Sequence, residues 1–296
     1  PARYRISHRT EYRYTAAVAV CQNQLRMQPT VTPTVLVNSS EIKIAPEPDS
    51  MTSHVDYFGN HVFTFSIEAL HESLTVDVQS DVTVRPTRGA PTDRGLTWRD
   101  LVNKLKQPVQ NHLLFAAEYC FASPKIRWND AIRQYALTSF EKEDSLATAA
   151  LNLTKRIQDD FQYDGSATRV DTPVEESFAL KAGVCQDFAQ IQVACLRSIG
   201  LPARYVSGYI RTTPPPGQER LIGADESHAW VSLYAGPEIG WLEYDPTNGC
   251  LTNRDHIAIC MGRDYLDVSP MRGVAVGGGS PTLKVSVDVE EIPLES

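Results

Sequence analysis

The sequence lacks the features that mark several classes of protein. Six cysteines in 296 residues are too few and too scattered for a disulfide framework. No apolar run approaches the roughly 18 residues of a membrane span, and no calcium-binding loop of the EF-hand type is found. The net charge is −8 and no basic stripe occurs, which argues against a nucleic-acid partner. The first residues lack the apolar core of a secretory signal, and we expect a cytoplasmic protein; a signal removed by processing is the alternative. The lack of a long apolar run predicts no membrane partner.

The first part of the chain has the alternation that is typical of β-strands. Aromatic and apolar side chains fall on even positions from Tyr4 to Tyr14. The segment 35–44 is also strand-like, and the same alternation recurs over 63–67 and 74–84. Short strands separated by turns predict an antiparallel β-sandwich-like domain over residues 1–86. Its histidines have no nucleophile near them in the sequence and are interpreted as strand-face or loop residues: His8, His54, His61 and His71.

A proline- and glycine-containing stretch follows, and the pattern then becomes helical. We expect a linker over 87–100 and a core of helices and strands over 101–270. Ser145 is the expected N-cap of a helix with one apolar stripe. The last segment, 271–296, has the pattern of a loop and one strand.

Cys185 lies in the first turn of a predicted helix. The preceding helix is expected to begin after Thr172, as its N-cap, and to end at Gly183 in the C′ position. The helix that carries Cys185 is expected over 184–199. Unpaired N–H groups and the dipole at a helix start favour a thiolate over a thiol, so Cys185 is a candidate nucleophile. The alternative is a small buried core residue, which is how we interpret Cys195.

Two predicted strands further along carry a histidine and an aspartate. His228 begins the strand over 228–234, and Asp245 ends the strand over 241–245. If the two strands pair as a hairpin, the start of one faces the end of the other, and the carboxylate can orient the imidazole. Cys185, His228 and Asp245 would then be the thiolate, the acid/base and the orienting group of a nucleophilic site. A structural role is the alternative for a histidine taken alone.

Three other features have less specific interpretations. Asp187 is expected to stabilise the start of its helix through the dipole and not to catalyse. Tyr163 is a candidate for the second oxyanion donor, with side-chain packing as the alternative. The polar, proline-rich segment 211–220 is a hypothetical lid over a site, or a plain surface loop.

Nothing in the sequence requires a cofactor. Cys250, His256 and Cys260 lie close together in the chain but lack the usual close cysteine pair and a fourth ligand of a zinc site. We therefore expect neither a metal nor a cofactor.

Three stretches resemble the core of the transglutaminase-like superfamily: GVCQDFAQIQVACLRSIGLPARYVSGYI, ESHAWVSLY and WLEYDPTNG. The beginning of the chain, including YRISHRTEYRY and DYFGNHVFTFSI, is similar to the β-rich domain that precedes this core in bacterial members. The resemblance implies a papain-like α+β core in which the nucleophile's helix packs on an antiparallel sheet. It assigns the nucleophile to Cys185, the histidine to His228 and the aspartate to Asp245. None of these positions is substituted, which implies an intact triad.

The resemblance and the triad together predict a transglutaminase-like cysteine protease or amidase. The expected reaction is acyl transfer through a thioester, ending in hydrolysis of an amide or peptide bond of a protein or peptide substrate. One alternative is a protein-glutamine gamma-glutamyltransferase that crosslinks proteins. Another is a non-catalytic protein-binding module. The sequence specifies neither the acyl donor nor the oligomeric state.

Overall fold

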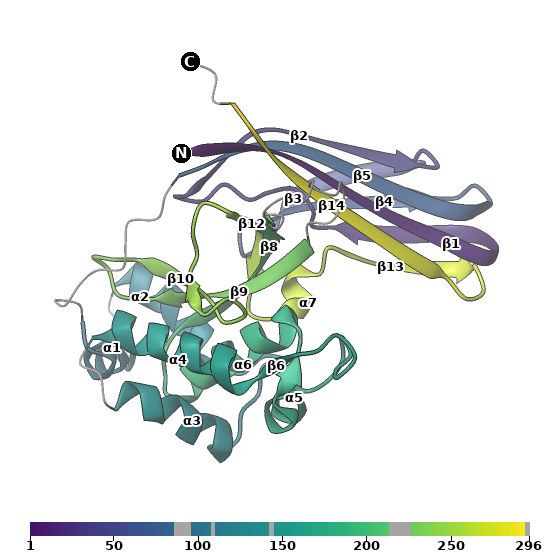
Figure 1. Cartoon of the computed structure of the whole chain (residues 1–296). Helices are drawn as coiled ribbons and strands as arrows, with labels where there is room; N and C mark the ends of the chain where they lie inside the picture. The colour runs from purple at the N-terminus through teal and green to yellow at the C-terminus, as the bar shows by residue number, and fades with distance from the viewer. Residues whose placement is uncertain (86–95, 108–109, 142–144, 213–225, 294–296) are drawn as a thin grey trace, which may run out of the picture.

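The computed structural model describes residues 1–85, 96–107, 110–141, 145–212 and 226–293. Within these ranges the chain forms two antiparallel sheets, one of seven strands and one of five, with the longer helices gathered against the smaller sheet (Figure 1). The predicted α+β class, with an antiparallel sheet at the N-terminus, is confirmed. The domain boundaries stay a prediction, and α1 (Trp98–Leu105) begins inside the range expected as linker.

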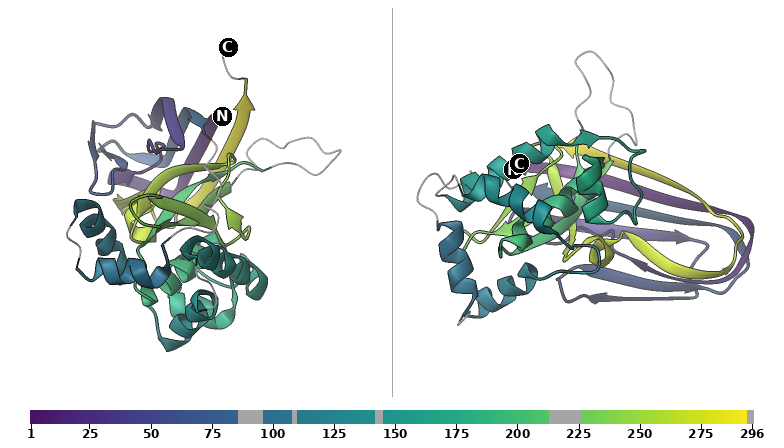
Figure 2. Two further views of the ribbon diagram at one scale, coloured as in Figure 1. Left: turned by 90° about the vertical axis from the view of Figure 1, so that its left-hand side faces the viewer. Right: turned by 90° about the horizontal axis from the view of Figure 1, so that it is seen from below.

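The larger sheet is built around one long strand. Its seven strands are β1 (Ala2–Leu25), β2 (Val35–Ala45), β3 (Ser50–Val55), β4 (His61–Ile67), β5 (His71–Val84), β13 (Met271–Gly277) and β14 (Thr282–Ile292). The order is β2-β5-β1-β4-β3, with β13 and β14 also pairing with β1. The first and last strands of the chain therefore lie side by side, as two further views show (Figure 2). The C-terminal segment forms two strands, where the sequence had predicted a loop and one strand.

A change of register divides β1 into two parts. Residues 3–13 pair with β14 on one side and β5 on the other, whereas residues 21–25 pair with β13 and β4. Apolar side chains from the second part of β1 pack against residues of β4 and β5 in a small core of their own. Apolar side chains from the first part pack with the helices in the main core of the molecule. The larger sheet therefore has a small hydrophobic core of its own and also contributes side chains to the main core, which it shares with the helices.

The smaller sheet carries the helices. Its strands are β8 (Ala203–Ile210), β9 (Glu226–Tyr234), β10 (Trp241–Asp245), β11 (Cys250–Leu251) and β12 (His256–Gly262), in the order β11-β10-β9-β8-β12. The remaining elements are α2 (Asn111–Ala117), η1 (Glu118–Cys120), α3 (Asp130–Phe140), α4 (Leu146–Asp160), β6 (Gln162–Tyr163), α5 (Val174–Leu180), β7 (Ala182–Gly183), α6 (Cys185–Ser198) and α7 (Tyr265–Val268). Ser145 caps α4 as predicted.

Helix α6 lies at the centre of this half. Its residues from Asp187 to Ser198 are all buried, because α3, α5 and the strands β8 and β9 surround it. A helix that is apolar on more than one face is typically enclosed in this way by other elements. Cys195 is fully buried, as expected for a core residue.

The helix before α6 ends differently from the prediction. Its N-cap is Pro173 and not Thr172, and its left-handed terminal residue is Lys181, with φ 52°, and not Gly183. Ala182 and Gly183 instead form the two-residue strand β7, which pairs in parallel with β6. The prediction failed because glycine is the usual residue at this position, whereas here a lysine adopts the left-handed conformation.

Two further expectations from the sequence concern the hypothetical lid and membrane-spanning segments. The hypothetical lid over 211–220 lies, apart from its first two residues, outside the described residues. Among the helices that the structure describes, none is long and apolar enough to cross a membrane.

Candidate active site

The start of α6 is fixed by hydrogen bonds around Cys185. The carboxylate of Asp187 accepts the backbone N–H of Val184 at 2.9 Å and the hydroxyl of Thr168 at 2.6 Å. Gly183 has no room for a side chain, because an added Cβ would lie 2.5 Å from Asp187 Oδ2. Asp187 therefore holds the turn that leads into the helix, in agreement with the structural role expected for it. Cys185 is the first helical residue and is partly exposed.

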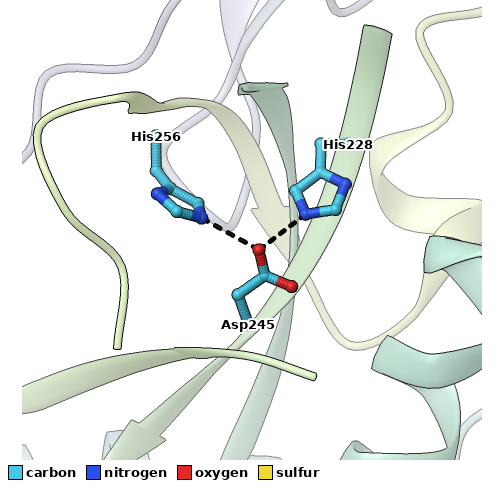
Figure 3. A group of neighbouring side chains, drawn as sticks. All are labelled: His228, Asp245 and His256. Carbon is cyan, nitrogen blue, oxygen red and sulfur yellow. Dashed lines mark hydrogen bonds and ion pairs between the residues drawn. The ribbon is translucent and has the colours of Figure 1, made fainter. Parts of the chain in front are cut away.

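His228 and Asp245 meet at one end of the smaller sheet. Strands β9 and β10 pair antiparallel, with Val231 opposite Tyr244, so the predicted hairpin is confirmed. Nε2 of His228 lies 2.8 Å from Oδ2 of Asp245 (Figure 3). A carboxylate can only accept when ionised, so His228 donates through Nε2 and its Nδ1 is left for another partner. Cys185 is a neighbour of the imidazole, since both side chains line one cleft and the sulfur contributes to the raised pKa of His228.

Asp245 is saturated with hydrogen-bond donors. Oδ1 accepts the backbone N–H groups of Thr247 at 2.9 Å and Asn248 at 3.1 Å. Oδ2 accepts His228, the side-chain amide of Asn248 at 2.6 Å, and His256 at 2.9 Å. Burial alone would raise the pKa of Asp245, but the hydrogen bonds from the two histidines bring it well below the ordinary value of 3.8. A fully buried carboxylate is thereby kept ionised.

The same contacts control the charge of His228. Burial lowers the pKa of an imidazole, but the hydrogen bonds to Asp245 and to Cys185, together with their charges, outweigh burial and raise the pKa of His228 from 6.5 to about 10. The arrangement therefore favours an imidazolium between a carboxylate and a sulfur at neutral pH. Such a pair is chemically suited to keep a cysteine as a thiolate.

His256 was missed as a member of this group. It begins β12, and its Nε2 donates to the same oxygen of Asp245 that His228 contacts (Figure 3). Its Nδ1 lies 3.2 Å from both the backbone nitrogen and the side-chain oxygen of Asn253. No local sequence pattern predicts this contact, because β8 and β9 lie between β12 and β10 in the sheet.

A glycine permits this close packing of strands. An added Cβ on Gly208 would lie 2.3 Å from the ring of Trp230 and 2.3 Å from the carbonyl oxygen of Ile257. The Trp230 ring stands edge-on to His256, with centroids 5.4 Å apart, and its N–H donates to Glu243 at 2.9 Å. Trp230 and Glu243 therefore lie on the same face of the smaller sheet.

Comparisons with known proteins agree with this architecture. Residues 4–83 match the model of the bacterial transglutaminase-like N-terminal region, and residues 133–246 match the model of the transglutaminase-like superfamily. The chain belongs to the transglutaminase-like superfamily. The second match contains Cys185, His228 and Asp245.

Two related sequences and one solved structure are similar to this chain over different lengths. An uncharacterized protein of Mycobacterium tuberculosis is 35% identical over 296 residues, covering 99% of this chain and 93% of the relative. A protein-glutamine gamma-glutamyltransferase of Pseudomonas aeruginosa is 27% identical over 162 residues, covering 48% of this chain and 24% of the relative. A solved structure from Cytophaga hutchinsonii, provisionally described as a cysteine protease, has a TM-score of 0.74 at 17% identity and covers 100% of this chain and 92% of its own. That likeness shows the fold.

The superfamily core also contains one group of side chains that could hold a metal ion. Among the described residues, one ligand atom from each of His228, Asp245 and His256 lies within 4.8 Å of the others. Oδ2 of Asp245 already accepts three donors, and a metal would have to displace the two histidine N–H groups. The residues fit a hydrogen-bonded carboxylate better than a metal centre. Cys250 and Cys260, the other members of the trio that had been considered for zinc, are not part of this group.

Cys185 and His228 open into a cleft of about 310 Å³ between the two halves of the molecule. Its walls include residues of β1, α6, β8, β9 and β14. His8 of β1 is one of them, so the N-terminal sheet reaches the site, which its sequence had not suggested. Tyr163, the candidate oxyanion donor, is 53% exposed and packs edge-on against Phe188 at 6.2 Å, consistent with the packing alternative.

Proposed function

We propose that this protein is a cysteine-dependent acyl-transfer enzyme that hydrolyses amide or peptide bonds of a protein or peptide substrate. The observation that carries the proposal is the position of the His228 ring, which is hydrogen-bonded to buried Asp245 and lines one cleft with Cys185. The transglutaminase-like fold supports the same reaction class. Cys185 is the nucleophile, His228 the acid and base, and Asp245 the residue that orients and charges the ring.

The reaction begins with the thiolate of Cys185 attacking the carbonyl carbon. The carbon–sulfur bond forms, and the carbonyl oxygen becomes an oxyanion. The backbone N–H of Cys185, at the start of α6 and without an intrahelical partner, supports that oxyanion, and one such donor is typically worth about 3–4 kcal/mol. His228 then gives its proton to the departing amine, the carbon–nitrogen bond breaks, and a thioester remains.

Hydrolysis completes the cycle. Neutral His228 takes a proton from water as the water attacks the thioester, which releases a carboxylic acid and restores the thiolate and imidazolium. Asp245 stays ionised throughout, since its five hydrogen bonds keep it an acceptor. The cytoplasmic location stays a prediction.

Crosslinking is the second candidate. The observation that favours it is the similarity to a protein-glutamine gamma-glutamyltransferase over 162 residues. In that reaction a primary amine, in place of water, takes the acyl group from Cys185. We favour hydrolysis because water is always present and crosslinking requires its exclusion from the thioester.

Product analysis tests the proposal. Glutamine-containing proteins are incubated with the enzyme, with and without an added primary amine, and ammonia and new peptide termini are measured. We expect hydrolysis products that disappear in the Cys185→Ala variant. Incorporation of the amine in place of hydrolysis would identify crosslinking. No product from any substrate, together with an ordinary rate of Cys185 alkylation, would leave the non-catalytic binding module as the correct reading.

A further inference from the structure

We propose that one face of β1 and β14 forms a binding wall for the acyl donor, and that this wall accepts an uncharged, apolar segment of a polypeptide. The proposal rests on the function proposed above, since it concerns the same cleft. The term binding wall means Tyr12, Leu283 and Val285, which line the cleft that holds Cys185 and His228.

The register of β1 and β14 places these side chains on one face of the sheet. Tyr12 pairs with Leu283, Thr10 with Val285, and His8 with Val287. Residues opposite each other in an antiparallel pair share a face, and alternate residues along a strand do the same. The face is therefore continuous from the contact with the smaller sheet out to the cleft.

Exposure changes sharply along that face. Val287 and Val289 are buried, and His8 is buried with its Nδ1 2.5 Å from the hydroxyl of Tyr209. Further along the same face Val285 is 48% exposed and Leu283 is 56% exposed. The face that anchors the sheet to the core thus continues past the contact as an uncovered apolar surface beside the nucleophile.

Apart from Cys185 and His228, the described residues that line the cleft carry no charge. None of the cleft-lining residues among those described is Lys, Arg, Asp or Glu. Charged residues do occur on the same strands, but Glu11 and Lys284 are at alternating positions and point to the opposite face. A charged side chain placed against the binding wall would lose water without gaining a partner, whereas an apolar one would gain by burial.

The position of the binding wall in the same cleft as Cys185 indicates which part of the substrate binds to it. The wall and Cys185 line one cleft, so a chain whose carbonyl is at Cys185 must run past the wall. The donor segment beside the reacting group is therefore apolar.

Two substitutions test the wall. Val285→Asp and Leu283→Asp place a carboxylate in it, and Val276→Asp is the matched control, because Val276 is 63% exposed on β13 of the same sheet and outside the cleft. The substrates are two peptides with one reacting glutamine, flanked in one by leucine and valine and in the other by glutamate. We expect wild-type enzyme to prefer the apolar peptide, and each wall variant to lose about 10- to 100-fold in kcat/KM for it, mainly through KM.

Alkylation of Cys185 by iodoacetamide separates the wall from the catalytic pair. The small reagent does not need the wall, so its rate at pH 6 should be the same in wild type, the wall variants and the control. Unchanged kcat/KM in both wall variants, or an equal loss in Val276→Asp, would overturn the wall while fast alkylation left the proposed function standing. If a wall variant also loses fast alkylation, it is replaced by Val285→Thr, which keeps the shape of the side chain and adds no charge. A smaller loss of kcat/KM for the apolar peptide in Val285→Thr supports the wall, and no loss overturns it. Slow alkylation of wild type would instead remove the proposed function, and the wall with it.

Discussion

Two histidines line the cleft beside Cys185, one from each half of the molecule. His8, from the N-terminal sheet, is 3% exposed, and His228, from the smaller sheet, is 7% exposed. Burial lowers the pKa of His8 from 6.5 to about 4. Its hydrogen-bond partners, the hydroxyls of Tyr209 and Thr10, carry no charge that would oppose this effect. The pKa of His228 moves the other way, to about 10, against the same penalty of burial.

The difference lies in the partners and not in the burial. A hydroxyl can hydrogen-bond to either form of the ring, whereas an ionised carboxylate specifically stabilises the charged form. Asp245 supplies that carboxylate to His228, and five donors keep it ionised. One cleft therefore contains a histidine that is neutral near pH 7 and another that is charged. The following predictions test this comparison, from the largest expected effect to the smallest.

Removing the charged ring should have the largest effect. We expect His228→Ala to lower kcat for amide hydrolysis by about 10⁴-fold or more, because both the thiolate and the proton donor are lost. The measurement is steady-state turnover of a glutamine peptide. Since the two residues act as a unit, Cys185→Ala combined with His228→Ala should be no worse than Cys185→Ala alone. Full additivity of the two losses would argue against a pair.

Asp245→Asn should make His228 resemble His8. The amide keeps the size of the side chain but lacks the charge that stabilises the imidazolium, and we expect kcat to fall by about 10³- to 10⁴-fold. The ring should become neutral at pH 7, which a pH profile of turnover measures. A loss below about tenfold with an unchanged profile would show that the carboxylate does not set the charge of the ring.

His256 should modulate the carboxylate. His256→Leu removes one donor to Oδ2 of Asp245, and we expect a loss of about 10- to 100-fold in kcat with a shifted pH profile, since hydrogen bonds to charged groups are worth about 1.5–3 kcal/mol. His256→Gln retains a donor and is the matched control, expected to recover most of the activity. Equal losses in both variants, with an unshifted profile, would indicate that the residue acts only in packing.

Protonation of His8 should lower the stability of the fold, and His8 should not affect the reactivity of Cys185. Its pKa in the folded state lies below its ordinary value, so the unfolded chain binds more protons between about pH 4 and 6.5, and stability is lost as pH falls through that window. The full shift corresponds to at most about 3 kcal/mol. Urea unfolding of His8→Gln should show a smaller loss between pH 6.5 and pH 4 than wild type, with the same alkylation of Cys185 at pH 6. An equal acid loss in both proteins, or slowed alkylation, would contradict this role.

Much of the site was predictable because its signals are local. Cys185 at a helix start and the hairpin that joins His228 to Asp245 follow from patterns within short segments. The resemblance to a known superfamily then linked the three residues across the chain. The end of α5 was predicted wrongly because Lys181 adopts a conformation that the sequence pattern assigns to glycine.

The rest depends on contacts between distant segments. Strand β14 pairs with β1 from the other end of the chain, which brings Leu283 opposite Tyr12 in the cleft that Cys185 also lines. His256 reaches Asp245 from β12, two strands away from β9 in the sheet. Neither pairing leaves a periodic signal in the sequence, since alternation predicts a strand but not its neighbour.

The charge of His228 is most directly measured by nitrogen NMR of the histidine rings during a pH titration. With the His228 and His8 signals assigned through His228→Gln and His8→Gln, the structure predicts that the His228 ring stays charged through neutral pH and titrates near 10, while His8 stays neutral until near pH 4. A His228 ring that is neutral at pH 7, with a titration at or below 6.5, would contradict the account.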